Sequence, residues 1–149
     1  VWETVLSEIV SKFIEAGQLA QAIEVAKTMK NGWEQRKFYR QTAVKFVEAG
    51  QFAHALDTVK LIEDKDSKII ALMEMVDWLI KSGQIKKVDH LLGIALEVVK
   101  TMKNSSDKAE AIANIALRYS NSGQTPSKQV QALLLEIVQM VDPIESFWK

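Results

Sequence analysis

A tripeptide that ends in Gly-Gln recurs four times along this chain. Its glycines are Gly17, Gly50, Gly83 and Gly123, so they stand 33, 33 and 40 residues apart. Each follows a stretch in which apolar side chains recur every three or four residues, and a glycine just past the last turn can close such a helix in the left-handed conformation. Repetition at a period in the thirties is typical of stacked helical hairpins. The spacing therefore predicts a helical repeat array, a form that builds extended binding surfaces.

Two apolar stripes in each repeat predict a pair of antiparallel helices. In the first repeat the stripe before the glycine is Val5, Leu6, Ile9, Val10, Phe13 and Ile14, and the stripe after it is Leu19, Ala22, Ile23, Ala26 and Met29. No stretch shows the alternation of a strand, so the predicted fold is all-α, with four antiparallel helix pairs. We expect a single repeat domain over residues 1–149, with repeats at about 1–32, 33–64, 65–104 and 105–143 and a tail at 144–149.

The third repeat is longer than the first by seven residues. Glu24–Asn31 is echoed by Glu97–Asn104, but the distance from the preceding glycine to the asparagine grows from 14 to 21 residues. Seven residues make about two helical turns, so the apolar face stays in phase. We therefore expect a longer second helix in this repeat and not an additional loop.

The last repeat has its own start and stop signals. Thr125-Pro126 is typical of an N-cap followed by a first-turn proline and predicts the start of the final helix. Asp142-Pro143 predicts its end. Residues 144–149 form an apolar tail that we expect to fold back as a cap; docking on another copy, or an end exposed by removal of further repeats, are the alternatives.

The spacing and the small–large alternation resemble tetratricopeptide repeats, whose motif runs W-x2-L-G-x2-Y, then A-x3-F and later P. The second repeat offers Tyr39, Ala43 and Phe46 in its first helix, then Ala55 and Val59. The glycine of the motif's first helix is absent throughout, and its closing proline is missing between repeats. The resemblance covers nearly the whole chain. It implies an α-solenoid, a right-handed superhelix whose first helices line a concave peptide-binding groove.

Ala16–Val25 is also similar to pentatricopeptide repeats, which read single-stranded RNA one base per repeat. The specificity positions of that family match Glu8, Gln41, Glu74 and Asn114, and only Asn114 is of the small polar type usual there. Carboxylates that face phosphates oppose binding. RNA binding is therefore the less favoured interpretation.

Non-core positions of the predicted first helices form the candidate binding site, because they would line the concave surface. This surface has mixed charge, acidic toward the third repeat, with a methionine as an adaptable apolar contact. The alternative is a solvated helix face on which Arg40 pairs with a carboxylate of a neighbouring helix. The candidate partner-binding residues are Glu8, Ser11, Arg40, Gln41, Met73, Glu74, Asp77 and Asn114.

Composition narrows the class of function. Nineteen basic and nineteen acidic residues cancel, so no net field attracts nucleic acid or an anionic membrane. The absence of cysteine excludes disulfides, thiolate catalysis and cysteine-based zinc sites. No apolar run approaches the length of a transmembrane helix. His54 and His90 stand at non-equivalent positions, and we expect exposed helix residues there, not metal ligands or catalysts.

These patterns together predict a non-enzymatic, soluble scaffold module that binds a peptide or protein, without cofactor, metal or membrane partner. Self-assembly through the open ends of the array is a further alternative. A cysteine-free chain fits a reducing compartment, so the expected location is the cytoplasm. The start at Val1 lacks an initiator methionine and a signal segment, which favours a piece of a longer protein.

Overall fold

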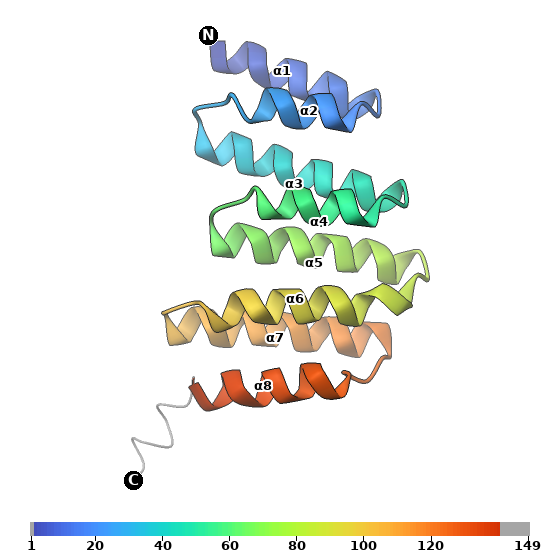
Figure 1. Ribbon diagram of the computed structural model, residues 1–149, viewed down its shortest axis with the longest axis vertical. Coiled ribbons are helices and arrows are strands. Elements are labelled where there is room, and N and C mark those ends of the chain that lie inside the picture. The colour runs from blue at the N-terminus through green and yellow to red at the C-terminus, as the bar shows by residue number, and fades with distance from the viewer. Residues whose placement is uncertain (1, 141–149) are drawn as a thin grey trace. The chain divides into compact units, whose positions relative to one another are not determined.

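The computed structural model describes residues 2–140, and all regular structure in that range is helical, as predicted. The helices are α1 (Trp2–Glu15), α2 (Leu19–Ala26), α3 (Gly32–Glu48), α4 (Phe52–Lys60), α5 (Lys65–Lys81), the 3₁₀-helix η1 (Ile85–Lys87), α6 (Val88–Lys100), α7 (Ser105–Ser122) and α8 (Lys128–Met140) (Figure 1). The predicted helix end at Asp142-Pro143 and the tail at 144–149 lie outside the described residues.

The chain divides into two compact units, residues 1–78 and 79–149, and the division falls inside α5. We call them the N-terminal and the C-terminal unit and describe each by itself. The single repeat domain expected from the sequence stays a prediction.

The glycines of the repeated tripeptide end α1, α3, α5 and α7 in the left-handed conformation, with φ between 70° and 79°. After α1, the Gly17 N–H donates to the Ile14 carbonyl at 3.0 Å and the Gln18 N–H donates to the Phe13 carbonyl at 2.9 Å. This pair of bonds satisfies carbonyls that the end of a helix leaves without partners. After Gly123 the pattern changes, because the Gln124 N–H donates to the Ser122 hydroxyl at 3.1 Å.

The starts of the first helices repeat at the same intervals as the glycines. Asn31, Asp64 and Asn104 each accept a hydrogen bond from the backbone N–H three residues ahead, at 3.1, 2.9 and 3.1 Å. Such caps satisfy a free donor of the first turn. Asp64 is thus the N-cap of α5.

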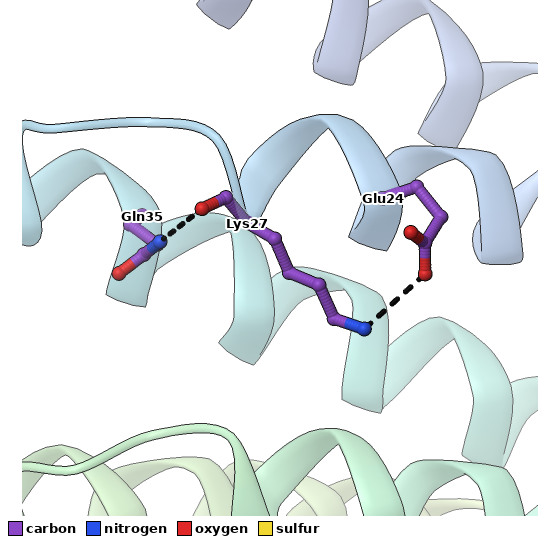
Figure 2. A network of polar contacts seen from close by, with 3 residues as sticks. All are labelled: Glu24, Lys27 and Gln35. Carbon is purple, nitrogen blue, oxygen red and sulfur yellow. Dashed lines mark hydrogen bonds and ion pairs between the residues drawn. The ribbon is translucent and has the colours of Figure 1, made fainter.

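In the N-terminal unit, α1 packs against α2 and α3 packs against α4, and α3 also contacts both helices of the preceding hairpin. Gln35 of α3 ties the hairpins together, since its side-chain amide donates to the Ala26 carbonyl at 3.0 Å. The same amide donates to the Lys27 carbonyl at 3.4 Å (Figure 2). Lys27 also pairs with Glu24 at 3.2 Å. The buried apolar side chains include Leu6, Val10, Ala22, Ala26, Phe38, Tyr39, Ala43, Ala55 and Val59.

Two side chains of the predicted α1 stripe are only half-covered. Leu6 and Val10 are buried as expected, whereas Val5 and Ile9 are each 37% exposed. Helical periodicity identifies the apolar side of a helix, but it does not show how much of that side a neighbour covers.

In the C-terminal unit the lengthened second helix is confirmed, because the additional residues belong to η1 and α6. The fourth pair differs from the prediction: α8 packs mainly on α6 and only slightly on α7. A Cβ atom at Gly93 of α6 would stand 3.4 Å from a methyl carbon of Val130 in α8. The absent side chain therefore lets the two helices approach closely.

The final helix also begins later than Thr125-Pro126 predicts. Its first residue is Lys128, and the hydroxyl of Ser127, not that of Thr125, accepts a hydrogen bond from the Val130 N–H at 3.3 Å. Ser127 is held in place by Asp89 of α6, whose carboxylate accepts from the Ser127 N–H at 3.1 Å. This contact on α6 fixes where α8 starts.

Candidate protein-binding surface

An open groove of about 760 Å³ runs between α1 and the first half of α3. It brings together two of the predicted site residues, Glu8 and Ser11. Its lining combines apolar and charged side chains, namely Val5, Ser7, Glu8, Ile9, Ser11, Lys12 and Phe13 from α1 and Glu34, Lys37 and Phe38 from α3. We call it the α1–α3 groove.

A polar contact crosses this groove from α3 to α1, and further contacts lie along α3 itself. Lys37 pairs with Glu34 at 3.4 Å, and the Ser7 hydroxyl donates to the same carboxylate at 3.5 Å. The Lys37 ammonium also lies 5.5 Å from the ring centre of Trp33 and 5.1 Å from that of Phe38. Partly exposed ion pairs are weak, so the pair of Lys37 and Glu34 adds little to the stability of the fold.

Three more predicted residues, Arg40, Glu74 and Asp77, meet where α3 faces α5. Arg40 Nε lies 3.6 Å from Glu74 Oε1, and this atom of Arg40 is buried. Burial raises the pKa of Glu74, Arg40 opposes that rise and Asp77 adds to it. The ion pair corresponds to the alternative in which Arg40 joins neighbouring helices.

Met73 is not on the surface, which corrects its assignment as an adaptable contact. It is 5% exposed. In the repeat it matches Arg40, which is half-buried. Complete burial of an apolar side chain at such a position stabilises the folded state, because its surface leaves water.

Gln41 is exposed on α3, outside the groove lining. Asn114 belongs to the C-terminal unit and bonds within α7: its amide donates to the Glu110 carbonyl at 3.2 Å, and Arg118 donates to its Oδ1 at 3.2 Å. Of the eight predicted residues, the structure thus joins Glu8 with Ser11 in the α1–α3 groove. It joins Arg40, Glu74 and Asp77 in a second group.

Sequence reasoning missed a carboxylate that links the helices of the C-terminal unit. Asp89 of α6 accepts a hydrogen bond of 2.6 Å from the buried Tyr119 hydroxyl of α7, in addition to the bond from Ser127. Burial alone would raise the pKa of Asp89, but these hydrogen bonds outweigh it, so the pKa lies below its ordinary value. The signal that could have found it is the seven-residue insertion, since Asp89 lies in the lengthened helix.

The histidines, possible metal sites and possible membrane spans were also compared with the part of the chain that the structure describes. His54 and His90 are both exposed, as expected. Residues 2–140 contain no group of three or more His, Asp or Glu side chains that could hold a metal ion. Across the same residues, no helix combines the length and hydrophobicity needed to span a bilayer.

Comparison with protein-family models, with curated proteins and with solved structures returned no match. The residues and their geometry are therefore the basis for assigning a function.

Proposed function

We propose that this chain is a tetratricopeptide-like α-solenoid that binds a peptide or protein segment and does not catalyse a reaction. The α1–α3 groove carries this proposal. It is open, it lies on the first helices that such an array uses for binding, and it contains Glu8 and Ser11. The recurring helix caps and left-handed glycines support the repeat architecture.

The chemistry of the groove favours an extended or helical peptide over a small substrate. Its apolar side chains offer contact area, while Glu8, Lys12 and Lys37 place both signs of charge along it. Affinity would come from several modest contacts and not from one enclosed pocket. A ligand with alternating acidic and basic residues around an apolar side chain fits this lining.

The proposal is tested by capturing partners from a lysate of the source cells, with and without nuclease. Ser11→Arg places a long charged side chain in the groove, whereas Gln41→Arg adds the same side chain outside it. We expect a stoichiometric protein that survives nuclease, is retained by Gln41→Arg and is lost with Ser11→Arg. Affinity measured by calorimetry with the identified partner should fall at least tenfold, which is about 1.4 kcal/mol.

Other outcomes contradict the proposal. Retention that nuclease abolishes would favour the RNA-binding interpretation. Equal retention by both arginine variants would show that the partner binds elsewhere.

A further inference from the structure

The charged side chains that line the α1–α3 groove are unequal in number. They comprise three carboxylates and two ammonium groups, namely Glu8, Glu15, Glu34, Lys12 and Lys37. The groove therefore carries one more negative than positive charge, although the charges of the whole chain cancel. A local excess of one sign attracts ligands of the opposite sign.

Both ammonium groups of the groove already have a carboxylate partner on their own helix. Lys37 Nζ lies 3.4 Å from Glu34 Oε2, and it also lies over two aromatic rings of α3. Lys12 Nζ lies 3.6 Å from Glu15 Oε2. A carboxylate of a bound segment would therefore have to compete with a carboxylate of the groove for either ammonium group.

Glu8 is the carboxylate of this groove that has no such partner. Within residues 2–140 no hydrogen bond or ion pair engages its side chain, and the residue is exposed. Lys12 stands one turn after Glu8, but its ammonium group lies against Glu15 instead. A positively charged side chain of a bound segment would therefore meet Glu8 without displacing a contact of the fold.

We propose that the segment bound in the α1–α3 groove is basic and that one of its lysine or arginine residues pairs with Glu8. The inference rests on the proposed function and names the chemical class of its partner. An arginine can place two donors on the Glu8 carboxylate, whereas a lysine supplies a compact charge. An acidic segment would bring like charges together at Glu8, which opposes binding.

The test begins with a phage-displayed library of random peptides that is selected on the full chain. Peptides that bind in the groove are those that are lost with Ser11→Arg and retained by Gln41→Arg. Among them, lysine and arginine should be enriched over aspartate and glutamate, relative to the unselected library. A basic peptide from this set is then the probe for calorimetry.

Variants of opposite charge show whether the sign of the charge decides binding. Glu8→Lys should weaken binding of the basic peptide by about tenfold or more, because like charges then meet. Ser11→Glu should bind it at least as tightly as the wild type, and the repeat accepts a carboxylate there, since Asp77 stands at the equivalent position of α5. The control is Asp57→Lys on α4, which changes the net charge as Glu8→Lys does but lies outside the groove lining, and it should bind as the wild type does.

The salt dependence of binding is a second readout of the charge on Glu8. The affinity of the wild type for the basic peptide should fall as the ionic strength rises, because salt screens exposed charges. Glu8→Gln keeps the shape of the side chain and removes its charge, so its affinity should fall less. An equal salt dependence of the two proteins would overturn the inference, since Glu8 would then not be the group that meets the ligand charge.

Two results of the selection separate this inference from the proposed function. Groove-binding peptides that are neutral or acidic overturn the inference and leave the proposed function standing. Equal losses of binding with Ser11→Glu and Ser11→Arg also overturn it, because bulk and not charge would then decide binding. If no selected peptide is sensitive to Ser11→Arg, the proposed function fails and the inference fails with it. Circular dichroism confirms the fold of each variant.

Discussion

Asp89 is the residue at which three helices of the C-terminal unit are joined. It belongs to α6, and it accepts hydrogen bonds from Tyr119 of α7 and from Ser127 at the start of α8. Hydrogen bonds to a charged acceptor are stronger than those between neutral groups. The same contacts also raise the pKa of Tyr119, although burial of its hydroxyl is the larger cause.

We predict that Asp89→Ala lowers the free energy of unfolding by about 2 kcal/mol at neutral pH, because the Tyr119 hydroxyl and the Ser127 N–H lose their acceptor. The folded-state pKa of Asp89 lies below its ordinary value of 3.8. Its contribution is therefore complete above that value and disappears as the pH falls through it toward the folded-state pKa. Urea unfolding at several pH values measures this difference.

The matched control is Asp57→Asn, which removes a carboxylate paired with Lys60 at 3.8 Å on the exposed surface of α4. Its effect should stay within about 0.5 kcal/mol at every pH. If Asp89→Ala cost no more than this control, or if its cost did not shrink in acid, the hydrogen bonds of Asp89 would not stabilise the fold.

At the scale of residues, the sequence predicted which helix positions are exposed better than it predicted which residues contact one another. The helical spacing correctly separated Leu6 and Val10 from Glu8, because periodicity depends only on the helix itself. It misplaced Met73, since the burial of a side chain depends on the neighbour that covers it. Asp89 escaped notice for the same reason: its partners lie 30 and 38 residues away in the chain.

At the scale of helices, the contact between α6 and α8 depends on Gly93. A Cβ atom there would stand 3.4 Å from Val130, the limit of ordinary contact. We predict that Gly93→Val destabilises the protein by about 1–3 kcal/mol, because a β-branched side chain cannot turn away and must push α8 from α6. Thermal and urea unfolding measure the loss.

Gly93→Ala is the control for this prediction. It adds one methyl group that Val130 can accommodate, and it removes the entropic cost of glycine in a helix, so it should stabilise by about 0.5–1 kcal/mol. Destabilisation by both variants to the same degree would mean that the backbone at this position, and not the approach of α8, requires glycine.

The sequence predicted the existence of the helices and the length of α6, because glycine spacing and apolar periodicity are local signals. It did not predict that α8 would pack on α6. The Gly-Gln pair before α8 is the same as elsewhere, but four residues lie between Gly123 and Lys128, whereas one lies between Gly17 and Leu19. That longer connection lets α8 pack away from its hairpin partner. The contacts that join α8 to α6 include those at Asp89, at Gly93 and between Lys100 and Glu136.

At the scale of the whole molecule, the repeats in the sequence continue without a break, but the structure divides into two compact units. The division at residue 78 falls inside α5, where the sequence shows no break in periodicity. In repeat proteins each element contacts only its neighbours, so stability is a sum of local terms and need not be shared along the chain. We therefore expect the two units to respond separately to a local loss of stability.

Asp89→Ala tests this expectation when it is read by hydrogen exchange along the full chain. The exchange of amides in α6, α7 and α8 should become faster, because the lost hydrogen bonds lower the free energy of opening of the C-terminal unit. Amides in α1, α2, α3 and α4 should keep their wild-type rates. If exchange became equally faster in both units, residues 1–78 and 79–149 would open together. The variant would then have lowered one free energy of opening that applies to the amides of both units.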